Sequence, residues 1–156
     1  MPDYAGAVAA IKARLVANWT TTPIVYVNRQ PDPPFPPINP NTGDALPVIV
    51  IEVSGTKGDV YSFGAPGNRF WLYNGLISLH LLVPVNDGTE QAEQLVVSAA
   101  EIFRDALFYQ DANGSFVRTR APSPPDSGSA ANVEGAIVAG MFRVSCSIEF
   151  EYFHRA

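Results

Sequence analysis

Few residues of this sequence are of the kinds that carry acid–base, nucleophilic or metal chemistry. It holds two histidines, His80 and His154, and one cysteine, Cys146. A catalytic histidine needs a partner that fixes its tautomer, and His80 has no Cys, Asp or Glu within four residues. A single cysteine excludes an internal disulfide and any metal site built from several cysteines. The sequence therefore predicts no catalytic residue and no bound metal.

The other chemically capable groups have simpler explanations. Cys146 falls on the apolar face of a predicted strand, where burial would raise the pKa of its thiol and make it a poor nucleophile. Glu149 and Glu151 share the polar face of the same strand, and solvation accounts for them. We expect the protein not to be an enzyme, and an enzyme that uses His80 is the last of the alternatives.

The chain carries few charges for its length. Only 16% of its 156 residues are charged, against roughly 25% in an ordinary soluble domain, so contacts between subunits could hide part of its surface. The formal net charge of −5 argues against nucleic-acid and anionic-membrane binding, because both need a basic patch. No run reaches the ~18 apolar residues of a membrane-spanning helix, and the start lacks the pattern of a signal peptide. We expect a single domain over residues 1–156, intracellular in the cell that makes it.

Hydrophobic periodicity predicts the elements that hold these residues. Apolar residues three and four positions apart predict a first helix capped by Asp3, and a second helix capped by Asp87 or Thr89 whose apolar stripe runs to Leu107. Alternating patterns predict the two longest strands, and shorter apolar runs predict three more, with a bulge or bend at Gly75. These strands cover Ile24–Val27, Val48–Val53, Arg69–Val83, Phe116–Thr119 and Phe142–Tyr152. The order predicts an α+β fold, in which a largely antiparallel sheet carries two main helices on one face and long Pro/Gly-rich loops connect the elements.

Two of the predicted loops carry aromatic residues. The segment Gln30–Pro47 holds seven prolines, and it is either a solvent loop or an arm that lies on a neighbour, anchored by Phe35. The segment Gly55–Asn68 holds four glycines around Tyr61 and Phe63. It is either a flexible solvent loop or an assembly surface that includes the adjoining Arg69. The second alternative rests on the fact that aromatic and Arg side chains concentrate binding energy at interfaces.

Two arginines and a third loop complete the candidates. Arg118 and Arg120 point to one side of a short strand, where they either pair with carboxylates of a neighbouring subunit or form a solvated face. The segment Ala121–Ala131 is rich in Pro, Ser and Gly and is predicted to be a mobile loop. The candidate assembly residues are therefore Phe35, Tyr61, Phe63, Arg69, Arg118 and Arg120.

The order of these elements matches that of a known group of proteins. Asn18-Trp19-Thr20-Thr21-Thr22-Pro23 closes the first helix, and a Pro-rich segment and the strand from Val48 follow. Then come Gly67-Asn68-Arg69-Phe70, Gly75-Leu76-Ile77, Pro84, Gly88, Ile102-Phe103 and Ile148-Glu149-Phe150-Glu151-Tyr152. Over nearly the whole chain this pattern resembles the small phage tail-completion proteins, in particular the lambda-type tail terminators of siphophages.

The resemblance implies a structural virion protein with an α+β fold, no enzyme activity and no cofactor. Its partners would be copies of itself in a ring, typically a hexamer, with the tail tube protein on one side and the head-side connector on the other. The genome would pass through the ring without sequence-specific contact, and no membrane would be involved. The resemblance implies a place at the head-proximal end of the tail, and in the host cytoplasm during assembly. Two alternatives stay open, a head–tail connector or neck protein and a monomeric module that holds a small ligand.

Overall fold

The computed structural model describes residues 3–85, 88–129 and 140–155. Within these ranges the chain forms two helices and seven strands. The helices are α1 (Tyr4–Asn18) and α2 (Glu90–Glu101). The strands are β1 (Ile24–Tyr26), β2 (Val48–Val60), β3 (Phe70–Pro84), β4 (Leu107–Phe108), β5 (Phe116–Thr119), β6 (Asp126–Ser129) and β7 (Met141–Arg155).

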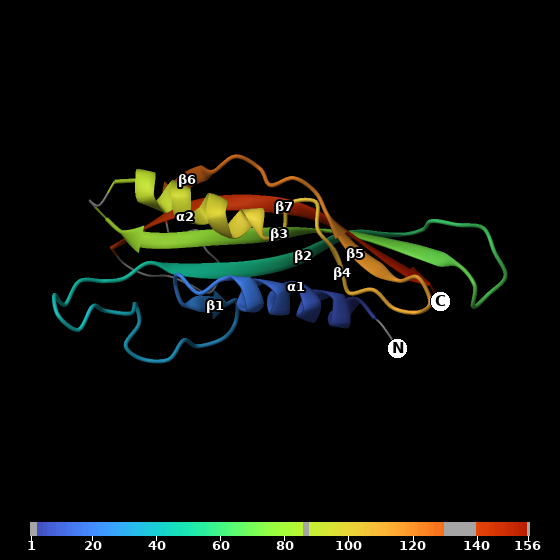
Figure 1. Ribbon diagram of the computed structural model, residues 1–156, viewed down its shortest axis with the longest axis horizontal. Coiled ribbons are helices and arrows are strands. Elements are labelled where there is room, and N and C mark those ends of the chain that lie inside the picture. The colour runs from blue at the N-terminus through green and yellow to red at the C-terminus, as the bar shows by residue number, and fades with distance from the viewer. Residues whose placement is uncertain (1–2, 86–87, 130–139, 156) are drawn as a thin grey trace.

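One large sheet dominates the molecule, and both helices lie on the same face of it (Figure 1). The strand order is β1-β2-β3-β7-β5-β4, and β6 also pairs with β7. All neighbouring strands are antiparallel except β1 and β2, which run parallel. The predicted α+β class, with a largely antiparallel sheet and two helices on one face, is confirmed.

The main core forms where the helices meet the sheet, and simple periodicities account for it. α1 buries Ala7, Ile11 and Leu15, one residue per turn of the helix. β3 and β7 bury every second residue along much of their length, including Leu79 and Cys146. Asp3 caps α1 as predicted, because its carboxylate accepts a hydrogen bond from the Gly6 N–H at 2.6 Å.

Gly75 is needed where β2 and β3 cross the core. A Cβ atom on this residue would come within 2.4 Å of the Phe150 ring and 2.5 Å of the Ser54 carbonyl oxygen. A bulge or bend was predicted at Gly75 on β3. The register shift occurs at this position along the pair, but on the partner strand β2, between Gly55 and Lys57. The extra residue therefore bends β2 directly across from Gly75.

A smaller apolar cluster lies on the opposite face of the sheet, at the end where β2 begins. The Pro-rich segment covers it, since Phe35 and Ala45 pack against the cluster from this side. The segment is folded, with an isolated bridge between Ile38 and Ala45. The buried members of the cluster are Val25, Val48, Val50, Leu82 and Met141.

The β2–β3 hairpin is longer than the sequence predicted. Residues 55–60 were expected in a loop, but they continue β2, and only residues 61–69 connect the strands. The glycines in residues 55–60 led to the prediction of a loop, because glycine is usually depleted in strands. Gly58 is needed for packing, since a Cβ on it would lie 2.9 Å from the Tyr73 ring.

The second helix is shorter than predicted. α2 ends at Glu101, whereas its apolar stripe continues to Leu107, which is exposed in β4. The buried Thr119 hydroxyl donates to the Phe103 carbonyl and accepts from the Ala106 N–H, which draws this stretch onto β5. Thr89 occupies the cap position of α2 without a side-chain hydrogen bond, and the competing cap Asp87 lies outside the described residues.

The segment after β5 is not a free loop. Arg120 and Ser123 donate their N–H groups to carbonyls of β7, at 2.9 and 2.8 Å, and residues 126–129 form β6 on the same edge. Prolines in between lack the N–H that a continuous ladder needs, so the edge strand is broken into β5 and β6. The last residues of the predicted mobile loop, 130 and 131, lie outside the described residues.

Candidate functional site

The candidate assembly residues fall in three separate places. Tyr61, Phe63 and Arg69 lie in the connection of residues 61–69, which we call the hairpin tip. Phe35 lies in the Pro-rich segment, at the opposite end of the long axis (Figure 1). Arg118 lies on β5 and Arg120 directly after it. The structure therefore brings together only the first three of these residues.

The hairpin tip presents an aromatic side chain on a structured backbone. Phe63 is fully exposed, at 107% of its reference accessibility, and Tyr61 is 63% exposed. Arg69 Nε donates to the Gly64 carbonyl at 2.8 Å, and the Phe70 N–H donates to Ser62 Oγ at 3.0 Å. The Tyr61 ring also rests edge-on against Phe153, with the ring centres 5.2 Å apart. The hydrogen bonds and the aromatic contact fix the backbone of the tip, and Phe63 remains exposed to solvent.

Phe35 has a different setting from the one the sequence suggested. Its ring is half-buried against the sheet of its own chain, beside Val25 and Val48. The backbone around it is closed by a hydrogen bond from the Leu46 N–H to the Pro37 carbonyl at 2.7 Å. Its use as an anchor on a neighbour stays a prediction, and its clearest role here is to attach the Pro-rich segment to its own sheet.

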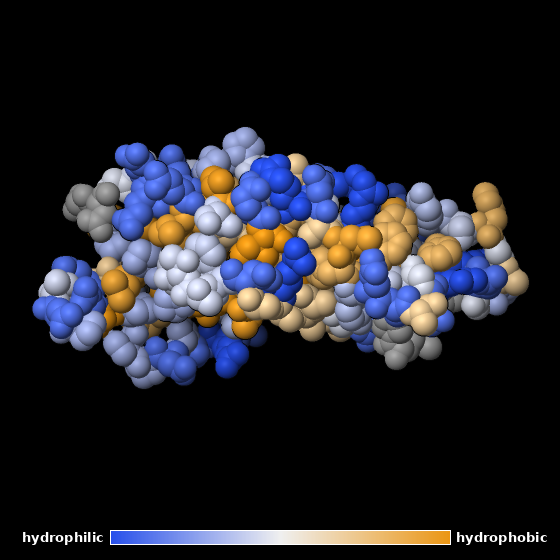
Figure 2. Space-filling model, in the orientation of Figure 1, coloured by the Kyte–Doolittle hydropathy of each residue, from blue (hydrophilic) through white to orange (hydrophobic). Residues whose placement is uncertain are grey.

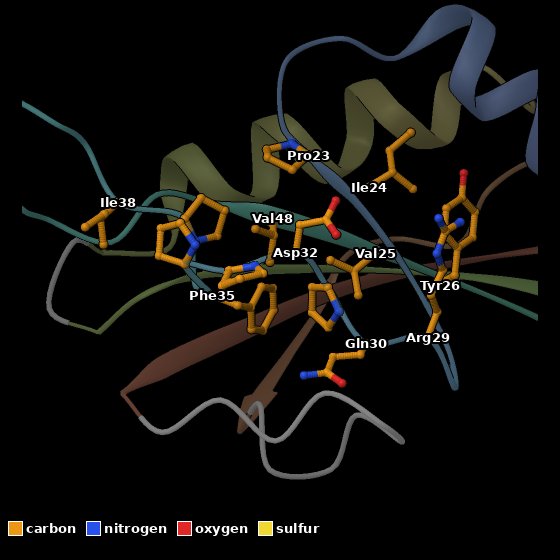
Figure 3. A pocket seen from close by; sticks show the side chains of 14 residues that line it. Pro23, Ile24, Val25, Tyr26, Arg29, Gln30, Asp32, Phe35, Ile38 and Val48 are labelled. Atoms are coloured by element: carbon orange, nitrogen blue, oxygen red, sulfur yellow. The ribbon is translucent and has the colours of Figure 1, made fainter.

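A groove lies between β1 and the Pro-rich segment, and the sequence analysis missed it. It has a volume of about 460 Å³ and lies beside an edge strand of the sheet. Phe35, Ile38 and several prolines form its accessible apolar part, and Arg29, Gln30 and Asp32 add polar groups (Figure 3). A short strand followed at once by many prolines was the available signal, but the way the segment folds back could not be inferred from it.

The two arginines near β5 behave differently from each other. Arg120 Nη2 lies 2.9 Å from a carboxylate oxygen of Glu151 in its own chain. The hydrogen bond and the charge of Glu151 raise the pKa of Arg120 above its ordinary value. Arg118 is exposed, and it lies across from Glu151 in the sheet register. Of the two alternatives for Arg120, a carboxylate of a neighbour or a solvated face, the structure shows neither, because Glu151 of the same chain supplies a carboxylate.

His80 has spatial partners that its sequence neighbourhood did not reveal. Its Nδ1 lies 2.7 Å from Ser145 Oγ, and its Nε2 lies 3.6 Å from a carboxylate oxygen of Glu52. Burial lowers the pKa of His80, the charge of Arg143 lowers it further, and Glu52 opposes both effects. Ser145 lies in the middle of β7, with His80 across on one side and Asp126 on the other.

His80 and Ser145 are close enough to share a proton. The backbone around Ser145, however, differs from that around a nucleophilic serine. Such a serine stands where N–H groups converge on the developing oxyanion, commonly at a turn. Ser145 instead sits between paired strands. Cys146 beside it is buried, and burial raises the pKa of its thiol as predicted. Among residues 3–85, 88–129 and 140–155, no group of three or more His, Cys, Asp or Glu side chains is placed to hold a metal ion.

Comparisons with known proteins identify a similar fold. No family model and no curated protein matches the sequence. A solved structure whose name states no function has a TM-score of 0.53 and 20% identity, over 94% of this chain and 92% of that chain. At this identity the likeness concerns the fold alone, which the two chains share over nearly their whole length. In the part of the chain that the structure describes, no helix is long and apolar enough to cross a membrane.

Proposed function

We propose that this protein is a phage tail terminator, a structural virion protein that forms a ring on the last ring of the tail tube. The ring ends polymerisation of the tube and joins the tail to the head-side connector. In this proposal the protein is not an enzyme and acts without a cofactor. It assembles in the host cytoplasm and ends at the head-proximal end of the tail.

The observation that carries this proposal is the exposed aromatic hairpin tip. Phe63 is exposed together with its neighbours Val60 and Tyr61, and apolar side chains that gather on a surface typically mark a place that another molecule covers. Figure 2 shows small apolar spots among hydrophilic residues near both ends of the long axis, over the hairpin and over the Pro-rich segment, while the broadest apolar area of this face lies in the middle. A ring of identical subunits needs two different patches on each subunit, and the exposed apolar side chains of the hairpin tip and of the Pro-rich segment are the candidates for them.

A knockout of the gene in its phage or prophage tests the proposal. Loss of a terminator is expected to give tails of irregular, excessive length without heads, as seen by electron microscopy. Loss of a neck connector, the nearest alternative, would leave tails of normal length without heads. Tails of normal length that carry heads would overturn both proposals, as would a gene outside any phage or prophage.

Complementation of the knockout then tests the tip. The double variant Tyr61→Ser, Phe63→Ser is expected to fold, because both side chains are exposed, but not to restore normal tails. The matched control is Val16→Ser, Val97→Ser, which removes two exposed apolar side chains from the helices. Rescue by the tip variant as complete as by the control would remove the tip from the assembly surface.

A second candidate function, a small-ligand module, is favoured by the groove beside β1. The groove is large enough to hold a small molecule and combines an apolar floor with a few polar groups. A chain that is monomeric in solution and in every assembly, and that retains a small molecule through purification, would favour this candidate.

A further inference from the structure

We propose that the hairpin tip of one copy binds in the groove beside β1 of the next copy, so that copies join head to tail. The inference rests on the proposed function to the extent that both need the chain to associate with itself. It goes further in naming both halves of the contact. One half is Phe63 with its neighbour Tyr61, and the other is the groove, whose accessible apolar lining is Phe35, Ile38 and several prolines.

The positions of the two halves require that the contact joins different chains. The tip and the Pro-rich segment lie at opposite ends of the long axis of the molecule (Figure 1). The tip is anchored by its own hydrogen bonds and by the Tyr61–Phe153 contact, so it cannot reach back along its own sheet. A contact between unlike ends is repeated by every copy and builds a ring where the rotation closes.

The two halves also match in size and chemistry. The groove volume of about 460 Å³ accommodates an aromatic side chain with part of its loop. Its apolar floor suits a phenylalanine, whose burial removes roughly 150–250 Å² from water. Proline rings on the wall present rigid apolar surface whose conformation costs little entropy to fix on binding.

The surroundings favour a second copy over a small molecule. Exposed apolar side chains lie in the groove lining at Ile38, elsewhere in the Pro-rich segment at Leu46, and next to the tip at Val60. Among the described residues, neither Asp32 at the groove nor Arg69 at the tip forms an ion pair. The groove also holds Arg29, whose guanidinium lies over the Tyr26 ring of its own chain, 5.8 Å from the ring centre. The charge left for a pair across the contact is therefore Asp32, which is opposite in sign to Arg69, as in complementary interfaces.

Sedimentation velocity of the full chain tests the inference through one defect in each half. We expect the wild type to associate beyond the dimer as its concentration rises. Phe63→Ser removes the tip, and Ile38→Glu places a charge on an exposed residue that lines the groove. Each variant alone is expected to stay monomeric, whereas Val97→Ser, on the exposed side of α2, is expected to behave as wild type.

Mixing the two variants gives the sharper result. Phe63→Ser retains a groove and Ile38→Glu retains a tip, so only one kind of contact can form. The mixture is expected to give a one-to-one dimer and nothing larger. Failure to dimerise, or larger species in the mixture, would overturn the inference, and unfolding temperatures show whether each variant is folded.

Cysteine cross-linking provides a second measurement that does not depend on the variants staying monomeric. Cys146 is buried, so Ala65→Cys with Gln30→Cys places one new thiol on an exposed residue of the tip and one at the groove. Oxidation is expected to give a ladder of covalent oligomers, whereas each single variant is expected to stop at the dimer. No ladder would contradict the inference.

These outcomes separate the inference from the proposed function. Oligomers that persist in both single variants would show that copies join elsewhere, which overturns this contact and leaves the proposed ring. A wild-type chain that stays monomeric at every concentration also overturns the inference in solution. The knockout of the preceding subsection then decides the function independently.

Discussion

Among single residues, His80 has the clearest consequence for stability. The titratable or charged groups that face it are Arg143, Glu52 and Asp126. Burial and the Arg143 charge lower the pKa of the folded-state imidazole below 6.5, the ordinary value, which we take for the unfolded chain. At a pH between these two pKa values the unfolded chain binds a proton that the folded chain does not, so acid favours unfolding.

We therefore expect His80→Gln to reduce the pH dependence of stability. The variant removes the titration, and glutamine can still form a hydrogen bond with Ser145. As the pH falls from about 7 to about 5, the wild type should lose more of its unfolding free energy than the variant, as measured by urea titration. The difference between the two chains isolates His80, because the carboxylates are common to both. A difference that does not change with pH would contradict this assignment.

Among the elements, α2 and the turn after it give a graded test of the core. Phe103 is completely buried, whereas Leu95 is only partly buried on the helix and Val97 is exposed. We expect Phe103→Ala to lower the unfolding free energy by about 3–5 kcal/mol and Leu95→Ala by about 2 kcal/mol. Val97→Ala should change it by less than about 0.5 kcal/mol. Urea unfolding of the three variants checks the order, and an equal loss for Phe103 and Leu95 would contradict it.

The parts of the fold that could be predicted are those with a buried face of their own. β7 and most of β3 alternate buried and half-buried residues, and α1 combines a regular stripe with a capping aspartate. The far half of β2 has no buried face, so nothing in residues 55–60 revealed a strand. The end of α2 depends on the hydroxyl of Thr119, which is distant in sequence and could not be inferred locally.

The same distinction applies to the candidate site. Tyr61 and Phe63 could be predicted as exposed because glycines and a proline surround them in the sequence. The pairing of His80 with Ser145 depends on the register between β3 and β7, which no local pattern specifies. The groove forms where β1, which pairs in parallel with β2, meets the folded Pro-rich segment at one edge of the sheet. No local sequence pattern predicts that these two segments lie side by side.

On the scale of the whole molecule, the protection of backbone amides from hydrogen exchange should show which ends of the molecule bind other copies. β2 has β1 on one side and β3 on the other at Ile49–Ile51, and these residues are buried. Farther along, at Gly55–Val60, β2 pairs with β3 and its side chains are exposed. Amides in such sparsely packed regions open at a low free energy, so they exchange quickly with solvent in a free chain.

We expect hydrogen exchange to slow at both ends together when copies associate. Peptides from the hairpin tip and from the Pro-rich segment should gain protection in a concentrated wild-type sample, as measured by mass spectrometry. The central residues Ile49–Ile51 should not change, because their protection already comes from the sheet. Phe63→Ser at the same concentration is the control for crowding and should show no gain. Protection of the tip alone would mean that Phe63 binds a surface other than the groove, since a head-to-tail contact must cover one end of each partner and therefore both ends of the average chain.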